Sequence, residues 1–141
     1  MKKRILSLAL SAAMALTMLP TGAFAAGDKG KPPVYNKATG CYEISTPDQL
    51  LYLSGSWKDG TPRDGHYVLT ADIDMTGVKG FKPIASKKEQ GFIGTFDGQF
   101  HAIKGLRVEY EKKYAGLFGY VGNQDDQAYI KNVALLDCYV T

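Results

Sequence analysis

The sequence predicts an all-β fold, a β-solenoid of about three coils, and two internal repeats are the main grounds for this prediction. A Gly-x-x-Gly motif at residues 91–94 recurs 116 − 91 = 25 positions later, and Ile103-Lys104 recurs at Ile130-Lys131, 130 − 103 = 27 positions later. Repeats of about 20–50 residues are typical of stacked architectures. A unit of this length is also too short for a βαβ unit, which needs about 30 residues.

The first 25 residues have the pattern of an export signal. Lys2, Lys3 and Arg4 form a basic start, residues 5–19 are apolar, and Ala23-Phe24-Ala25 is a small-x-small cleavage site. The apolar run is short for a bilayer span of about 20 residues, although an uncleaved anchor is the alternative. We therefore predict a signal peptide at 1–25, a linker at 26–40 and a module at 41–141, truncated at its C-terminal end. The expected location is secreted or at the cell surface.

Charge argues against a nucleic-acid partner. The chain has 17 basic and 14 acidic residues, and the predicted signal contains three of the basic ones, so 17 − 3 = 14 of each sign remain. No basic block is left that would neutralise a row of phosphates. We expect contact with a membrane only through the export signal.

Cys41 and Cys138 would reach an oxidising compartment after export. A disulfide needs Cα atoms within about 7 Å, whereas stacked strands are about 4.8 Å apart. Several coils between the two cysteines would therefore leave them as thiols. The sequence leaves the bridged and the free state open.

The module is expected to begin with a strand at residues 41–44 and a short helix after it. The helix has a capping box, made of Thr46 as N-cap, Pro47 at N1 and Gln49 at N3. Its apolar face comprises Leu50, Leu53 and Trp57. It should end near Ser54-Gly55 and cover the N-terminal end of the stack, as terminal caps do in solenoids. Residues 67–73 then alternate apolar and polar, which predicts the next strand.

The repeat units predict a stacking register. Phe92, Gly94 and Phe96 share one face of an extended segment. The expected stacked pairs are Phe92 on Leu117, Gly94 on Gly119 and Phe96 on Val121. Ile93 and Phe118 would then lie on the opposite face, and a solvent-exposed Phe118 would indicate a partner surface.

A second register follows from the Ile-Lys copies. Gly105-Leu106 and Asn132-Val133 follow them at matching positions, where the alternation of period two fails. Gly and Asn best tolerate the left-handed backbone region. We predict left-handed or bulged corners at Gly105 and Asn132, stacked on each other. The alternative is a two-residue hairpin at Asp97-Gly98, which would give an antiparallel sandwich.

Four segments together resemble the GLUG-motif repeat proteins. They are Tyr67-Val-Leu-Thr-Ala-Asp-Ile-Asp-Met75, Phe81-Lys-Pro-Ile84, Gly94-Thr-Phe-Asp-Gly98 with His101-Ala-Ile103 and Gly105-Leu106, and Gly116-Leu-Phe-Gly119. The resemblance implies a right-handed parallel β-helix that is secreted or on the cell surface, as in adhesin-like chains and the N-terminal regions of IgA-type metallopeptidases. Those peptidases have a His-Glu-x-x-His site in a separate domain, and this sequence contains no such motif. Family members usually have more repeats, so we expect further repeats or domains downstream.

Candidate chemical groups are few. His66 and His101 have no second histidine at a metal-ligand spacing. Asp72-x-Asp74 is a possible Ca²⁺ pair, with solvated or turn-bonding carboxylates as the alternative. Tyr35, Tyr110, Tyr114 and Tyr129 fall in loop-like contexts and fit either a glycan- or protein-binding face or packing between coils.

The predicted function is a non-enzymatic exported surface scaffold or adhesin-type repeat module, without metal or cofactor. The alternative is a secreted glycan- or protein-binding domain, and a polysaccharide-active enzyme is a third reading that would need paired carboxylates in a groove. The expected partner is a host or cell-surface protein or glycan. The structural repeat residues are Gly91, Phe92, Gly94, Phe96, Asp97, Gly98, Ile103, Gly105, Leu106, Gly116, Leu117, Phe118, Gly119, Val121, Ile130, Asn132 and Val133.

Overall fold

The computed structural model describes residues 30–55, 57 and 60–141, and this part of the chain is mainly β. The signal peptide expected at residues 1–25 lies outside the described residues, as do the first four residues of the expected linker. The strands are short and are grouped into three sheets. No helix within the described residues has the length and apolarity to cross a membrane.

The first sheet has the order β1-β2-β3-β5-β8. Its strands are β1 (Val34–Asn36), β2 (Cys41–Ile44), β3 (His66–Leu69), β5 (Thr95–Asp97) and β8 (Tyr129–Lys131). Strands β2, β3, β5 and β8 are parallel, whereas β1 is antiparallel to β2. The linker prediction is therefore wrong for residues 34–36, because Tyr35 pairs with Tyr42 and adds a strand to this edge.

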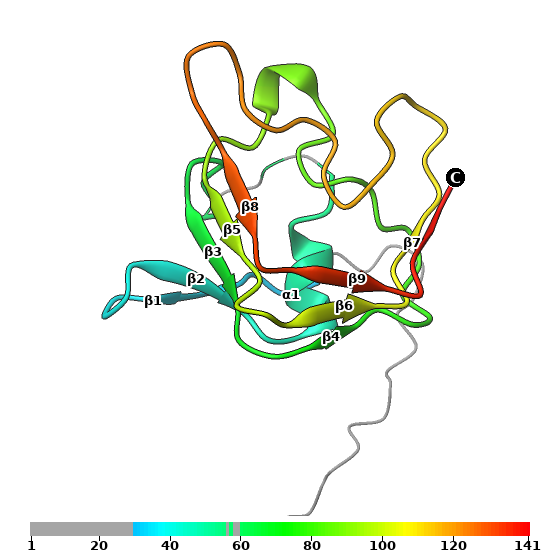
Figure 1. Ribbon diagram of the computed structural model, residues 1–141, viewed down its shortest axis with the longest axis horizontal. Coiled ribbons are helices and arrows are strands. Elements are labelled where there is room, and N and C mark those ends of the chain that lie inside the picture. Colours follow the sequence, from blue (N-terminus) through cyan, green and yellow to red (C-terminus); the bar gives the residue numbers. More distant parts are fainter. Residues whose placement is uncertain (1–29, 56, 58–59) are drawn as a thin grey trace, which may run out of the picture.

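The second and third sheets are also parallel. The second sheet contains β4 (Ile73–Asp74), β6 (Ala102–Lys104) and β9 (Ala134–Leu136), and the third contains β7 (Arg107–Val108) and β10 (Tyr139–Val140). The three sheets lie on successive sides of the molecule (Figure 1). We call each stretch that begins with one of the parallel strands of the first sheet a pass, so that the passes begin at β2, β3, β5 and β8.

Consecutive strands within a pass do not pair with each other. Strand β5 pairs with β3 and β8, from the passes before and after it, and β6 pairs with β4 and β9. The hairpin considered at Asp97-Gly98 is therefore wrong, because that dipeptide connects two different sheets. A parallel partner requires the chain to travel around and return, as it does here.

The register differs from the stacking that the repeats predicted. Phe96 pairs with Ile130, Ile103 with Leu135, and Phe92 forms a bridge with Val121. The predicted pairs Phe92–Leu117, Gly94–Gly119 and Phe96–Val121 are wrong. Partners in the last two passes are 130 − 96 = 34 and 135 − 103 = 32 residues apart, longer than the sequence repeat, because the loops between β7 and β8 take up extra residues.

The second Gly-x-x-Gly motif lies against a different segment from the one its sequence suggests. Ile84 forms a parallel bridge with Phe118, and the Gly119 N–H donates to the Ile84 carbonyl at 2.8 Å. Phe118 is half-buried and its ring lies 5.3 Å from that of Phe92 and 5.4 Å from that of Phe96. Phe118 is thus part of the packing between passes.

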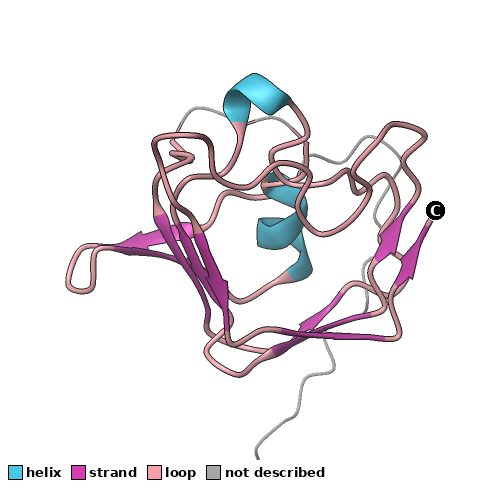
Figure 2. Cartoon of the chain, turned by 45° about the horizontal axis from the view of Figure 1, so that its top comes forward, coloured by secondary structure: helices cyan, strands magenta, loops and turns pink. Residues whose placement is uncertain are grey.

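A short α-helix, α1 (Pro47–Tyr52), follows β2, and a 3-10 turn, η1 (Lys88–Gln90), lies in the polar loop before β5. The capping box is present: the Gln49 N–H donates to Thr46 Oγ1 at 3.3 Å, and Gln49 Oε1 accepts from the Thr46 N–H at 3.2 Å. Leu50 and Leu51 are buried. In two views the helix lies inside the outline that the three sheets form (Figures 1 and 2).

The core lies between the three sheets and consists of aliphatic and aromatic side chains. Tyr67, Phe92 and Phe96 are almost fully buried, and Tyr67 stacks on Tyr42 at 5.1 Å between ring centroids. The Tyr67 hydroxyl donates to the Pro62 carbonyl at 2.8 Å, and burial raises the pKa of this phenol. Aromatic pairs of this kind add about 0.5–1.5 kcal/mol beyond the burial of their area.

Candidate functional site

Two corners connect the sheets, and their backbone is unusual. The first corner joins the first and second sheets, and there Gln99, Phe100 and Asn132 have φ of +48°, +65° and +54°. The second corner joins the second and third sheets, and there Gly105 and Asp137 have φ of +66° and +50°. The left-handed geometry predicted at Gly105 and Asn132 is confirmed. Their predicted stacking on each other is wrong, because they lie at different corners.

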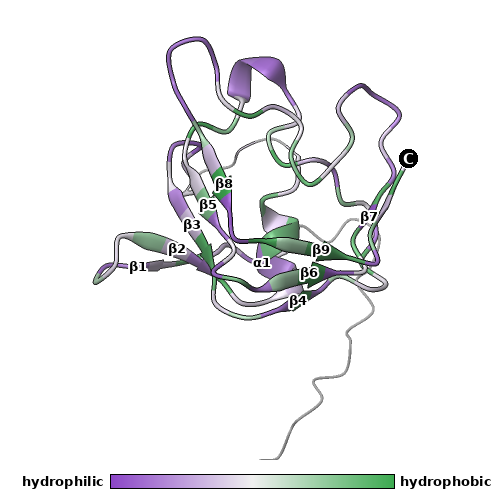
Figure 3. Ribbon diagram, viewed as in Figure 1, coloured by the Kyte–Doolittle hydropathy of each residue, from purple (hydrophilic) through white to green (hydrophobic). Residues whose placement is uncertain are grey.

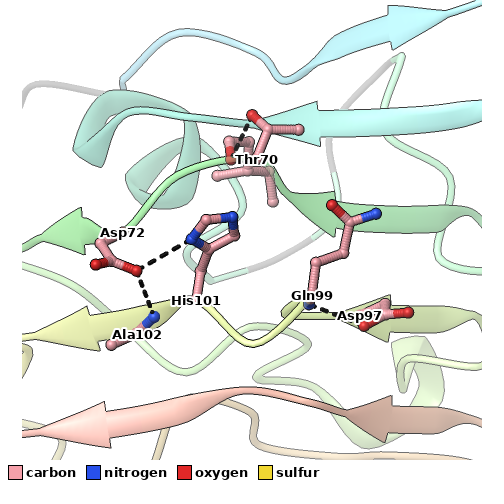
Figure 4. Close-up of polar contacts among 7 residues, drawn as sticks. Thr70, Asp72, Asp97, Gln99, His101 and Ala102 are labelled. Atoms are coloured by element: carbon pink, nitrogen blue, oxygen red, sulfur yellow. Dashed lines mark hydrogen bonds and ion pairs between the residues drawn. The ribbon is translucent and has the colours of Figure 1, made fainter.

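Carboxylates hold the first corner together. Asp72 Oδ1 lies 3.1 Å from His101 Nδ1 and accepts the Ala102 N–H at 2.9 Å, which ties the second pass to the third (Figure 4). The Ala102 N–H and then the His101 ring lower the pKa of Asp72. A carboxylate that accepts such bonds is favoured in its charged form.

Asp97 makes the equivalent connection between the third and fourth passes. Its Oδ1 accepts the Gln99 N–H at 2.9 Å and Asn132 Nδ2 at 3.0 Å, and its Oδ2 lies 3.5 Å from Lys131 Nζ. The Gln99 N–H is the main cause of the lowered pKa of Asp97. Asp72 thus links the second pass to the backbone of the third, and Asp97 links the third pass to side chains of the fourth, at the same corner.

The Ca²⁺ alternative at Asp72 and Asp74 gains no support from this geometry. Asp74 Oδ1 accepts the Thr76 N–H at 2.9 Å, and the Thr76 hydroxyl and N–H lower the pKa of Asp74. No three His, Cys, Asp or Glu side chains of the described residues are grouped so as to hold a metal ion. The prediction that the chain binds no metal stays a prediction.

The last strands expose an apolar edge, which we call the C-terminal edge: β8, β9 and β10. Ile130, Leu135 and Val140 are 39–48% exposed, whereas their partners one pass earlier, Phe96, Ile103 and Val108, are at most 1% exposed. Strand β9 is hydrophobic along its length (Figure 3). Positions that the stacking buries in one pass are therefore open in the last one, next to unpaired strand backbone.

Phe100 is an exposed corner residue that no motif in the sequence indicates. It is 88% exposed, and its backbone is left-handed at the first corner. Its N–H donates to the Asn132 carbonyl at 2.8 Å. The first corner has four residues between β5 and β6 but two between β8 and β9, and the additional residues form the bulge at Gln99-Phe100.

The four tyrosines considered for a binding face do not all lie in loops. Tyr35 is on β1 and Tyr129 on β8, which are opposite edges of the first sheet. Tyr110 packs against the core, and Tyr114 is 58% exposed with its ring 4.9 Å from that of Tyr120. These residues are therefore spread over the molecule.

Both cysteines are free and half-buried. Cys41 begins β2 in the first pass, and Cys138 lies between β9 and β10 in the last one, where its Sγ is 3.3 Å from the Leu136 carbonyl. Two further passes separate them in the first sheet. His66, on β3, is exposed, and His101 serves in the contact with Asp72.

Comparison with known proteins yields one partial similarity. Halomucin from Haloquadratum walsbyi (strain DSM 16790 / HBSQ001) is 32% identical over 117 residues, which covers 72% of this chain but 1% of halomucin. No family model matches the chain, and no solved structure matches it. The chain spans about one hundredth of the length of this relative, so the similarity concerns a segment and not the activity of the whole protein.

Proposed function

We propose that the chain is a GLUG-type right-handed parallel β-helix and that it serves as a non-enzymatic scaffold or adhesin-type module, secreted or displayed at the cell surface. In this proposal the passes are the coils, and α1 caps the N-terminal end. The observation that carries it is the parallel, residue-by-residue pairing of successive passes in three sheets. Parallel crossovers within one sheet are right-handed in about 98% of cases, which favours that hand.

The use of the charged groups supports a structural role. Asp72, Asp74 and Asp97 all accept backbone N–H groups at corners, and two of them connect neighbouring passes. Repeats of this kind gain stability from contacts between neighbours. The C-terminal edge is a surface on which the same stacking can continue, whether with further repeats or with a cell-surface partner.

Export is tested with the full precursor, tagged at its C-terminus and expressed in a bacterium. We expect the product outside the cytoplasm with Ala26 as its first residue, measured by fractionation and N-terminal sequencing. The matched control lacks residues 2–25 and should stay in the cytoplasm. A full-length chain retained in the cytoplasm with Met1 intact would contradict the export part of the proposal.

The scaffold role is tested against the enzymatic alternative. The secreted chain is incubated with a panel of neutral and acidic polysaccharides, and released reducing ends are measured over time. We expect no turnover. The stacking itself is tested by nuclear magnetic resonance, where we expect amide nuclear Overhauser contacts between Phe96 and Ile130 and between Ile103 and Leu135. Turnover that scales with enzyme concentration would overturn the non-enzymatic role, and missing contacts would overturn the stacking.

A further inference from the structure

A groove lies beside the second corner, away from the polar contacts of the first. Its volume is about 440 Å³, and it lies between the loop after β4 and strands β7 and β10. Lys79, Lys104, Arg107, Asp137 and Tyr139 are among its lining residues. A second hollow of about 320 Å³ also has Lys79 and Arg107 in its lining, and adds Glu109. The larger volume is within the usual range of about 300–1,000 Å³ for small-molecule sites.

The larger hollow is basic. Three cationic side chains and one carboxylate line it. The cations come from separate parts of the chain: Lys79 from the loop after β4, Lys104 from the end of β6 and Arg107 from β7. The folding of the passes therefore brings Lys79 of the second pass beside Lys104 and Arg107 of the third, and the concentration of these charges attracts an anion.

Arg107 and Tyr139 form a platform in this groove. They are direct partners in the pairing of β7 with β10, and the Arg107 guanidinium carbon lies 4.9 Å from the centroid of the Tyr139 ring. Both remain accessible, with Tyr139 51% exposed and the Arg107 side chain 60% exposed. The ring restrains the guanidinium by a cation–π contact and leaves N–H groups for a ligand.

We propose that this groove binds an anionic saccharide, a short segment of a uronate- or sulfate-bearing glycan. Arginine binds carboxylates and sulfates through paired N–H groups, and the lysines add charge. Tyr139 offers an apolar area with a polar tip, which suits the face of a sugar ring. A nucleic acid fits less well, because the predicted exported chain has equal numbers of basic and acidic residues, and Asp137 and Glu109 border the cations.

Glu109 provides an internal test. Its Oε1 lies 3.6 Å from Arg107 Nη1, so this carboxylate competes with an anionic ligand for the guanidinium. Removing its charge in Glu109→Gln frees Arg107, and the affinity for an acidic saccharide should rise roughly threefold. A role of these side chains in stability alone would not increase affinity.

The experiment is calorimetric titration of the full chain with defined probes: a tri-galacturonate, a heparin-derived hexasaccharide, cellotriose and a single-stranded oligonucleotide with the hexasaccharide's charge. We expect binding of one or both acidic saccharides and none of cellotriose. Lys104→Gln and Arg107→Gln should each weaken binding about five- to tenfold. Lys112→Gln and Lys113→Gln alter exposed cations outside the groove, and each should leave the affinity for the acidic saccharide within twofold of that of the unaltered chain. Circular dichroism and melting confirm the fold of each variant.

The outcomes separate groove binding from general charge attraction. Equal loss in the groove variants and in the control variants would overturn the proposal, and so would the lack of binding of either acidic saccharide. Binding of the oligonucleotide at least as tightly as the hexasaccharide, with the same dependence on Arg107, would assign the groove to nucleic acid instead. Weakening confined to the groove variants, with strengthening in Glu109→Gln, supports it.

Discussion

Asn132 has two roles, and both stabilise the first corner. Its backbone is left-handed, and its side-chain amide donates to Asp97 in the pass before. Short polar side chains visit this backbone region more readily than branched ones, for which the cost is about 1–2 kcal/mol. The residue therefore turns the chain at the first corner and joins two passes at that corner.

Replacing Asn132 separates these roles. Asn132→Val should lower the free energy of unfolding by about 1–3 kcal/mol, because it adds backbone strain and loses the hydrogen bond. Asn132→Gly keeps the conformation and loses only the hydrogen bond, so its loss should be about 1 kcal/mol or less. Urea denaturation measures both. Equal losses in the two variants would show that the conformation at this position does not matter.

Acid should destabilise the protein through the corner carboxylates. The pKa of Asp72, Asp74 and Asp97 is lowered from the ordinary value of 3.8, so the unfolded chain binds protons more readily than the folded one. Their contribution is complete above about pH 4 and is lost as the pH falls through the lowered folded values. Urea unfolding between pH 2 and pH 6 should show stability that falls as the pH drops below 4.

Asp97→Asn serves as the control for this pH dependence. With one titrating carboxylate fewer, its stability should fall less steeply below pH 4 than that of the unaltered chain. An unchanged slope would mean that Asp97 does not contribute to the acid sensitivity.

At the residue scale, the sequence predicts what depends on local chemistry. Gly105 and Asn132 could be recognised as corner residues because glycine and asparagine favour the left-handed region. Asp137 has a short polar side chain of the same kind, whereas Gln99 and Phe100 take this conformation without such a signal in their identity. The Phe100 N–H donates to the Asn132 carbonyl of the next pass, which is distant in the sequence, whereas the Gln99 N–H donates to Asp97 in its own pass.

At the scale of the element, the two glycines of each Gly-x-x-Gly motif differ in how much space surrounds them. A Cβ on Gly94 would clash with the Gly65 carbonyl oxygen, and one on Gly119 would lie 2.9 Å from the Ala85 carbonyl oxygen. The first glycine of each motif has more room, with the closest contacts at 3.2 Å for Gly91 and 3.3 Å for Gly116. The second glycine is therefore the one that allows two passes to approach.

Gly94→Ala should therefore destabilise the fold by about 1–3 kcal/mol, because the added methyl meets backbone that cannot move aside. Gly116→Ala is the matched variant and should cost less than about 1 kcal/mol. Thermal and urea unfolding of both proteins measure the difference. A smaller loss in Gly94→Ala than in Gly116→Ala would contradict the close approach at Gly94.

The strand register could not be predicted from the motifs, because residues at equivalent places in the two copies of a motif do not pair with each other. Ile103 and Ile130 occupy equivalent places in the sequence repeat, yet Ile103 pairs with Leu135 and Ile130 with Phe96. Pairing depends on how many residues each loop uses before the chain returns to the first sheet. The composition of the repeat contains no information on that path.

At the scale of the whole molecule, the C-terminal edge is the surface at which we expect association. Open strands with apolar side chains favour association. Leu135→Lys should keep the fold, since Leu135 is 48% exposed, and should reduce association at high concentration. Light scattering with size-exclusion chromatography measures this.

Ile103→Lys is the matched control for the edge variant, because Ile103 is the partner of Leu135 and is fully buried. A lysine buried without a partner should prevent folding. If Leu135→Lys also unfolded the protein, the edge would be part of the core. If it folded but associated as before, another surface would be responsible.

The mainly β character and the corner residues were thus within reach of sequence analysis. The antiparallel β1 was not, since residues 34–36 lie in a segment whose composition resembles a linker, and only Tyr35 and its pairing with Tyr42 reveal a strand. The groove of Lys79, Lys104 and Arg107 was also out of reach, because it depends on which passes are neighbours.

The growing distance between stacked partners has a consequence for engineering. Partners in the first sheet are 67 − 42 = 25, then 96 − 67 = 29, then 130 − 96 = 34 residues apart, while the pairing itself is maintained. The added length lies largely in loops, such as the exposed residues 111–114. Each doubling of the length of a flexible loop costs only about 0.6 kcal/mol. A foreign peptide or a fluorescent label inserted in this loop should therefore be exposed to solvent and leave the strand pairing unchanged, which makes the loop suitable for displaying it.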